Sequence, residues 1–138
     1  MVTVDLARRL RSAGLRWVPA RGDRFVLPDR GMDDEVFVLS DMTVEVHDFP
    51  GGSVIGFNGV TEWALDSVEQ GEALWLPAED QLRRLLGGLF TRLVATPDGF
   101  EVTVRMPDGE QCFSADDPSQ AYAEALRAVL VGVHARTA

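Results

Sequence analysis

The spacing of apolar residues predicts a helix at each end of the chain. Near the start, an apolar stripe recurs every three or four residues and comprises Leu6, Ala7, Leu10 and Ala13. Thr3 can cap the N-terminus of this helix, and Gly14 can end it. Near the other end, Asp117-Pro118-Ser119-Gln120 supplies a capping residue and a proline suited to the first helical position. The core face of this last helix comprises Tyr122, Ala125, Leu126, Val129, Leu130 and Val133.

Short alternating runs predict a hairpin in the first half of the chain. Met42–His47 alternates apolar and polar residues, as a half-buried strand does. The tight turn Phe49-Pro50-Gly51-Gly52 follows, and Ser53–Phe57 returns as the partner strand. Further short runs predict extended segments at Leu15–Val18, Arg24–Leu27 and Val36–Leu39.

Two helices and a meander are predicted in the second half. One helix runs from Thr61 to about Gln70, and the other begins at Pro77 and ends at Gly87-Gly88. Two Pro-Asp-Gly turns then separate three strand-like runs, which are Phe90–Ala95, Phe100–Met106 and Glu110–Ala115.

The predicted strands come in hairpins and not in βαβ units. The expected class is therefore α+β, with an antiparallel β-sheet built from hairpins and packed by about four α-helices. A chain of 138 residues suits a single globular domain, residues 1–138, with a core of its own.

Acidic residues concentrate in the middle of the chain. The stretch from Gly31 to Leu82 has twelve acidic residues and no basic one, whereas the first thirty residues have seven arginines and three acids. The net charge is −9. An asymmetry of this size bears on partners and solubility, not on the fold. We expect either partial neutralisation by the chain's own arginines or an acidic face that binds a basic surface of another protein.

The residue types present exclude several kinds of chemistry. All thirteen basic residues are arginine and the chain has no lysine. This excludes a Schiff base on a lysine side chain and a P-loop, which needs a lysine to bind phosphate. The chain has no Gly-x-Ser-x-Gly, no His-Glu-x-x-His and no pair of cysteines, which removes the nucleophile elbow and the common zinc sites. We therefore predict no catalytic residue and no cofactor. Cys112 alternates with its neighbours in a predicted strand, and we expect an inert thiol that is buried or half-buried.

Composition also predicts a location. A single cysteine favours a reducing compartment, and no apolar run approaches the roughly 18 residues that span a bilayer. The charged N-terminal sequence is unlike a signal peptide. We expect a cytoplasmic protein without a membrane partner. Nucleic acid is a poor candidate partner, because a chain of net charge −9 repels phosphates.

Glu45 and His47 form a candidate metal-binding pair. Two positions apart on a strand, they share one face at a spacing of roughly 7 Å. Imidazole and carboxylate groups are ligands for divalent cations, and Asp41 and Asp48 are close by in sequence. The alternative is a polar strand face that is merely solvated, and the same two interpretations apply to the acidic run 33–35.

The three tryptophans offer two interpretations. Trp17 and Trp75 each lie two positions before a proline, and Trp63 lies in a predicted helix. They can anchor the core and the ends of elements, or they can form an exposed aromatic platform suited to a basic or aromatic-seeking partner. The candidate binding residues are therefore Glu45, His47, Asp48, Trp63 and Trp75.

Several stretches of the chain resemble a group of small, uncharacterised bacterial proteins, mainly actinobacterial, that are sometimes called pilus assembly proteins of the CpaE type. The stretches are Asp5-Leu-Ala-Arg-Arg-Leu, Gly14-Leu-Arg-Trp, Gly22-Asp-Arg-Phe, Asp41-Met-Thr-Val-Glu-Val-His-Asp-Phe-Pro, Trp75-Leu-Pro and Asp80-Gln-Leu. The resemblance covers most of the chain and implies no functional residue. Proteins of the CpaE type are related to Walker-type ATPases, but a chain without lysine cannot form that phosphate site.

The leading prediction is a non-enzymatic cytoplasmic accessory or interaction domain with an acidic face for a basic partner. The alternative is a metal-binding or metal-dependent protein that uses Glu45, His47 and nearby acids. A third prediction is a homo-oligomer in which the arginine-rich N-terminal region of one copy contacts the acidic stretch of another.

Overall fold

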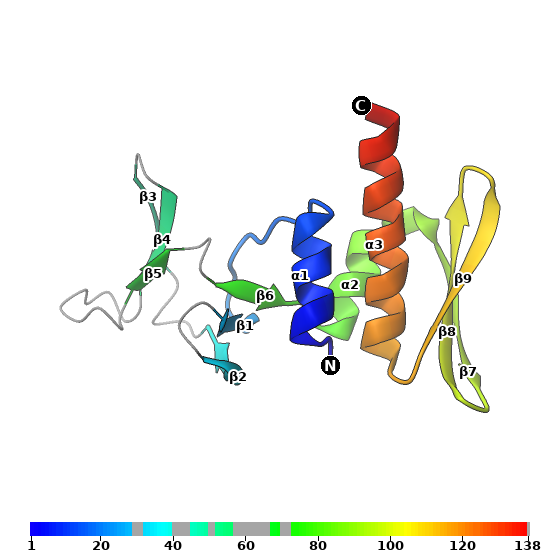
Figure 1. Cartoon of the computed structure of the whole chain (residues 1–138), viewed down its shortest axis with the longest axis horizontal. Coiled ribbons are helices and arrows are strands. Elements are labelled where there is room, and N and C mark those ends of the chain that lie inside the picture. Colours follow the sequence, from blue (N-terminus) through cyan, green and yellow to red (C-terminus); the bar gives the residue numbers. More distant parts are fainter. Residues whose placement is uncertain (29–31, 40–44, 50–51, 57–66, 70–72, 138) are drawn as a thin grey trace. The chain divides into compact units, whose positions relative to one another are not determined.

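The chain folds into two compact units. A computed structural model describes residues 1–28, 32–39, 45–49, 52–56, 67–69 and 73–137 (Figure 1). Met1–Arg16 and Pro77–Ala138 form one unit, here called the terminal unit, and Trp17–Leu76 forms the other, here called the central unit. The assignment of residues 1–138 to one domain stays a prediction.

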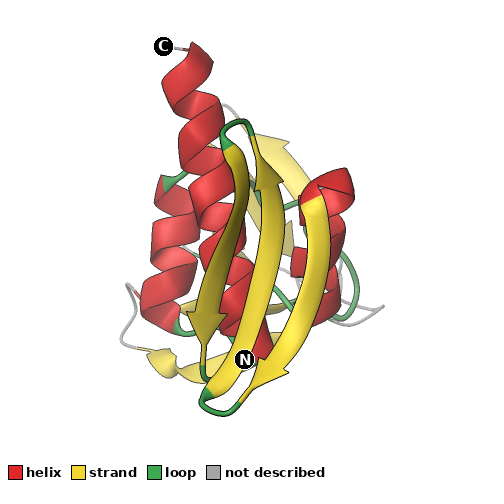
Figure 2. Cartoon of the chain, turned by 90° about the vertical axis from the view of Figure 1, so that its right-hand side faces the viewer, coloured by secondary structure: helices red, strands yellow, loops and turns green. Residues whose placement is uncertain are grey.

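The terminal unit places three helices on one side of a three-stranded antiparallel sheet (Figure 2). The helices are α1 (Val4–Ser12), α2 (Glu79–Leu86) and α3 (Pro118–Thr137), and the short 3-10 turn η3 (Gly87–Leu89) follows α2. The strands, in their order in the sheet, are β7 (Phe90–Thr96), β8 (Gly99–Met106) and β9 (Gly109–Ala115). Helix α3 packs on β8 and β9, and α1 and α2 pack on α3.

The ends of α1 have the caps that the sequence predicts. The hydroxyl of Thr3 accepts a hydrogen bond from the backbone N–H of Leu6 at 3.1 Å. At the other end, Gly14 adopts φ 109°, and the N–H of Leu15 donates to the carbonyl of Leu10 at 3.0 Å. This bond is the signature of a Schellman motif, which requires a left-handed residue and so favours glycine.

Helix α2 begins two residues later than the sequence predicts. Pro77 does not occupy the first helical position, because the residue after it, Ala78, is still extended at ψ 163°. Ala78 is the N-cap and has no side-chain acceptor to offer. The side chain of Gln81 compensates in part, since its Oε1 accepts from the backbone N–H of Ala78 at 2.9 Å.

Helix α3 begins as the sequence predicts, with Asp117 as its cap. The Oδ1 atom of Asp117 accepts from the backbone N–H groups of Ser119, at 2.6 Å, and Gln120, at 3.3 Å. Its other carboxylate oxygen pairs with the N-terminal ammonium of Met1. The cap therefore also ties the start of the chain to the start of α3.

Close packing of α3 on the sheet and on the other helices forms the core of the terminal unit. The most buried side chains on α3 lie in its first half and come from Ala121, Tyr122, Ala123, Ala125 and Leu126. Val102 and Val104 of β8 are fully buried, as are Leu10 of α1 and Leu82 of α2. The core of the terminal unit thus joins four elements, α1, α2, β8 and α3, from the two ends of the sequence.

The central unit contains two three-stranded antiparallel sheets. The first has the order β2-β1-β6 and consists of β1 (Arg24–Leu27), β2 (Met32–Val38) and β6 (Leu74–Leu76). The second has the order β3-β4-β5 and consists of β3 (Glu45–Phe49), β4 (Gly52–Gly56) and β5 (Ser67–Glu69).

The α+β class, the hairpins and the meander are confirmed, but three expectations fail. The described residues contain three α-helices and not about four. The end of the helix predicted over 61–70 is strand β5, which pairs with β4, so strand pairing outweighs local helix propensity there. Leu15–Val18 forms no strand, and β6 was not predicted. Residues 42–44, 50–51, 57, 61–66 and 70 of the predicted elements lie outside the described residues.

Gly99 is a position at which only glycine fits. A Cβ atom there would lie 2.3 Å from the carbonyl oxygen of Ala115 in β9. We predict that Gly99→Ala lowers the free energy of unfolding by about 2 kcal/mol, because one of the two strands must shift. Gly88→Ala is the matched control, since its Cβ would meet no atom within 4 Å. Urea unfolding followed by far-UV circular dichroism measures both, and equal losses would contradict the prediction.

Asp117 makes stability depend on pH. The hydrogen bond from the N-terminal ammonium lowers the pKa of Asp117 below its ordinary value of 3.8, and the N–H groups of Gln120 and Ser119 add to the effect against the opposing influence of burial. A lowered folded-state pKa stabilises the fold above the ordinary pKa, and this contribution is lost as pH falls through the folded-state value. We predict that wild type exceeds Asp117→Asn in melting temperature at neutral pH. This difference in melting temperature should shrink as pH falls below about 4. A difference that does not change with pH would contradict this explanation.

Candidate binding site

A row of aromatic residues crosses the β2-β1-β6 sheet of the central unit. Phe25 of β1 lies opposite Phe37 of β2 and opposite Trp75 of β6, so the three residues are cross-strand neighbours. The rings of Phe25 and Phe37 stack with centroids 5.5 Å apart. Trp17 packs against this row, with its ring 6.4 Å from that of Trp75 and nearly parallel to it. The row and Trp17 form the core of this sheet, together with Leu27, Leu39 and Ala73.

A buried aspartate holds Trp17 in place. Asp23 is only 4% exposed, and its Oδ2 accepts from the indole Nε1 of Trp17 at 2.8 Å and from the backbone N–H of Ala20 at 3.0 Å. The backbone of Asp23 also accepts from the N–H of Leu39 at 2.9 Å. No sequence motif marks Asp23, whose only signal is its place at the end of a short turn before β1.

Trp75 is an anchor of this core more than an exposed platform. Its side chain is half-buried, and its Nε1 atom is buried without a hydrogen-bond acceptor in the described part of the chain. A buried donor without a partner costs free energy, so the stacking on Trp17 must hold the indole there against that cost. Trp63, the other tryptophan selected from the sequence, lies outside the described residues.

The candidate metal ligands lie on strand β3. Glu45 and His47 pair with Gly56 and Val54 of β4, so they share one face of the strand, and Asp48 belongs to the alternate set. Glu69 of β5 lies opposite the same Val54. No group of three or more potential ligands is close enough to hold a metal ion among the residues searched, which are the described ones. A metal site at Glu45 and His47 stays a prediction.

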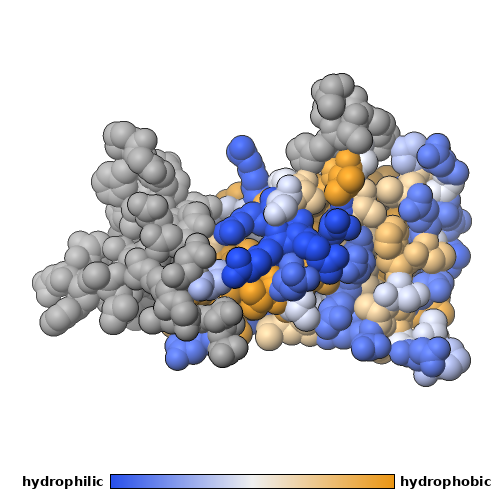
Figure 3. Space-filling view, in the orientation of Figure 1, coloured by the Kyte–Doolittle hydropathy of each residue, from blue (hydrophilic) through white to orange (hydrophobic). Residues whose placement is uncertain are grey.

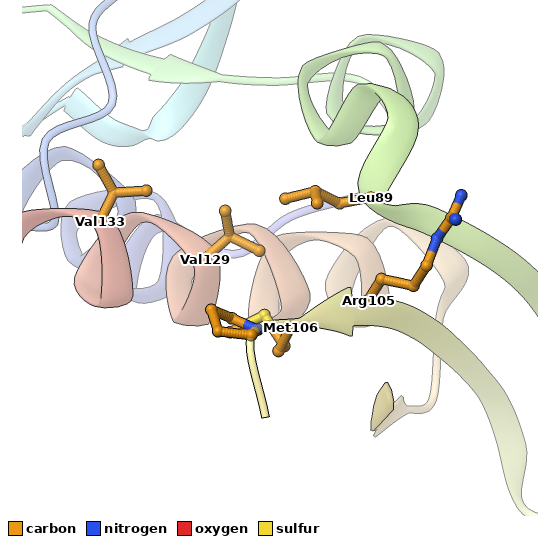
Figure 4. A pocket seen from close by; sticks show the side chains of 6 residues that line it. Leu89, Arg105, Met106, Val129 and Val133 are labelled. Atoms are coloured by element: carbon orange, nitrogen blue, oxygen red, sulfur yellow. The ribbon is translucent and has the colours of Figure 1, made fainter. Parts of the chain in front are cut away.

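An apolar hollow of about 380 Å³ lies beside the second half of α3 (Figure 4). Its lining comes from α3, from the end of β8 and from the turn after α2, and consists of Leu89, Arg105, Met106, Pro107, Val129 and Val133. The only charged group in this lining is the guanidinium of Arg105, which donates to the carbonyl of Gly88 at 3.0 Å. The hollow therefore has an apolar lining without an acid, a base or a nucleophile.

Cys112 is exposed, which corrects the expectation of a buried or half-buried thiol. It lies on the edge strand β9, on the face of the sheet opposite the helices. The closest polar group is the hydroxyl of Thr103 on β8, whose oxygen is 3.3 Å from the sulfur. Neither group adjoins a histidine or a carboxylate in the described contacts, so this pair lacks the base that activates a nucleophile.

Tyr122 is an ionisable group that is buried in the helical core. Burial raises the pKa of Tyr122, Glu79 raises it further, and Arg83 opposes this change. Its ring packs on Phe90 at 5.6 Å, and the guanidinium of Arg83 lies over the Phe90 ring at 4.3 Å. The phenol therefore stays protonated near neutral pH and serves in packing, not as a base.

The net charge of the protein resides entirely in the central unit. Residues 17–76 contain twelve acidic residues and three arginines, a net charge of −9, whereas the terminal unit has ten acidic and ten basic residues. Figure 3 shows a hydrophilic surface over α1, and the exposed residues of this helix include Arg8, Arg9 and Arg11. One of them, Arg9, pairs with Asp5 at 3.3 Å and with Glu124 of α3 at 3.2 Å, both within the terminal unit.

Comparison with known proteins gives no relative for this chain. No protein-family model, no curated protein and no solved structure matches it. In the described part of the chain, none of the helices combines the length and the apolar character needed to cross a bilayer.

The hydrogen bond from Trp17 to Asp23 should stabilise the central unit. We predict that Asp23→Ala costs about 2 kcal/mol, because it leaves a buried indole N–H without this acceptor. Asp23→Asn keeps a side-chain oxygen and should lose less. All three tryptophans lie in the central unit, so denaturation followed by tryptophan fluorescence reports on this unit alone. An Asp23→Ala variant as stable as wild type would show that the hydrogen bond contributes nothing.

Proposed function

We propose that the protein is a non-enzymatic cytoplasmic accessory protein whose acidic central unit binds a basic surface on another protein. The observation that carries this proposal is the segregation of charge, with a net charge of −9 on the 60 residues of one unit and none on the other. Solubility alone does not require that the net charge is confined to one unit, because interspersed charges of both signs also keep a protein soluble. Membership of the group that the sequence resembles stays a prediction.

Strand β2 offers the best-described part of such a face. It is an edge strand, and it has three consecutive acids, Asp33, Asp34 and Glu35. Glu35 is exposed, and the next residues on the strand include Val36 and Val38, which are 41% and 60% exposed. Apolar side chains beside a run of acids suit a partner with both basic and apolar side chains, because interfaces combine an apolar centre with a polar rim.

The described residues favour binding over catalysis. The hollow beside α3 has no acid, base or nucleophile in its lining, and the buried Asp23 is occupied by hydrogen bonds from Trp17 and Ala20. A charged face of one sign would instead accelerate association with a partner of opposite charge. Such steering weakens as salt shortens the screening length, which is about 10 Å at 0.1 M.

Neutralising the acids of β2 should weaken binding to the partner. Full-length wild type and the variant Asp33→Asn, Asp34→Asn, Glu35→Gln would be used in parallel as baits at low salt. We predict that a specific partner is retained by wild type, that its affinity falls steeply with added salt, and that the β2 variant binds it about tenfold more weakly.

The terminal unit supplies the matched control. Asp5→Asn, Glu79→Gln and Asp98→Asn remove three exposed charges from that unit at positions outside β9 and its flanking residues, and they should leave the affinity unchanged. A partner that is retained at high salt, or one that both variants lose equally, would contradict the proposal.

A further inference from the structure

Strand β9 is an edge strand without the usual protection. The three sheets present six edge strands among the described residues, namely β2 and β6, β3 and β5, and β7 and β9. Natural edge strands are shielded by short length, by charges or by bulges, which prevents pairing with another chain. Each of the other five has such protection. β5 and β6 have three residues each, β3 has two acids in five residues, and the pairing of β2 and of β7 is interrupted by register shifts.

β9 has seven residues in unbroken register with β8, and its only charged residue is Glu110. Met106 and Gly109 close a two-residue turn, and the closing pair of such a hairpin is hydrogen-bonded. Because hydrogen-bonded and non-bonded pairs alternate along the ladder, the backbone groups of Glu110, Cys112 and Ser114 point away from β8. The free edge therefore presents three residues with open donors and acceptors.

We propose that β9 pairs antiparallel with β9 of a second copy, on a two-fold axis at Cys112, to give a continuous six-stranded sheet. Cys112 is the middle residue of the strand, so this register uses all seven residues of both copies. It also places Cys112 where both of its backbone groups can bond to the same residue of the other copy, with Cα atoms roughly 5.5 Å apart.

The side chains of β9 are compatible with this register. Glu110 lies opposite Ser114 of the second copy, so the strand's only charge faces a hydroxyl and no like charge. Gln111 lies opposite Phe113 of the second copy, which is half-buried and gains a neighbour. A shift of the axis by one residue toward Phe113 would place Glu110 opposite Asp116, two acids in cross-strand contact, which is unfavourable.

The same register predicts how salt acts. Beyond the paired residues, Asp108 lies opposite Asp116 of the second copy at each end of the new ladder. Added salt screens this repulsion and should increase the dimer fraction, whereas it weakens the binding of a basic partner by the central unit. Seven paired residues bury little surface, so the dimer is weak and its fraction rises with protein concentration.

A short bis-maleimide tests the pairing directly, because Cys112 is the only cysteine in the chain. We expect a covalent dimer of the full-length protein whose yield rises with concentration and with salt, together with a dimer in light scattering. A protein that stays monomeric at all concentrations would overturn the proposal. So would a dimer in which Cys112 does not cross-link, because its interface would lie elsewhere.

Charge changes at Ser114 test the register. Ser114→Glu would face Glu110 of the second copy twice per dimer and should weaken dimerisation about tenfold, whereas Ser114→Lys should strengthen it. Val94→Glu is the control. Val94 of β7 and Ser114 of β9 are the two cross-strand neighbours of Glu101, so a glutamate at either position is repelled by Glu101 within the chain. Because β7 is not part of the proposed interface, Val94→Glu should leave the yield of cross-linked dimer unchanged. Equal effects of Ser114→Glu and Val94→Glu would overturn the proposed interface.

Discussion

The burial of one face of the β7-β8-β9 sheet under α3 is the constraint on which the terminal unit depends. The first half of α3 presents small residues, including Ala121 and Ala125, that are fully buried and allow close approach to its neighbours. Tyr122 and Leu126 fill the remaining space. This packing stabilises the sheet, because an isolated hairpin is at best marginally stable in water and needs further strands or a packed helix. With all three helices on this side, no helix in the described part of the terminal unit covers the other face of the sheet.

Electrostatics separates the two units as clearly as packing does. In the terminal unit, acids and arginines balance, and several form ion pairs within it, such as Arg92 with Glu110 at 3.3 Å and Arg84 with Asp80 at 2.7 Å. Exposed pairs of this kind add little stability, but they leave the unit without net charge. The central unit has a fourfold excess of acids over arginines and must tolerate its own repulsion. A basic partner would relieve that repulsion, which is a physical reason to expect one.

The sequence predicts the elements of this fold where local signals are strong. The helix caps at Thr3 and Asp117 follow from side-chain chemistry, and the cap at Gly14 follows from the positive φ that glycine adopts easily. The two Pro-Asp-Gly turns define the meander. Strands β5 and β6 were missed because three residues show no periodicity, and the partner of β6, which is β1, lies much earlier in the chain. For the same reason Asp23 was overlooked. Its importance comes from a hydrogen bond to Trp17 inside a core that only the folded chain assembles.

The charge division also determines which surfaces can bring two copies together. Two central units of net charge −9 repel each other within a screening length, so self-association is favoured through the neutral terminal unit. A sheet continued through β9 meets this condition, because β9 belongs to the neutral terminal unit. Such a dimer would display two acidic units, and a target with repeated basic surfaces would then bind both in one complex. The second contact would be intramolecular and would gain from a high effective concentration, so that a weak dimer and a weak, salt-sensitive contact would reinforce each other.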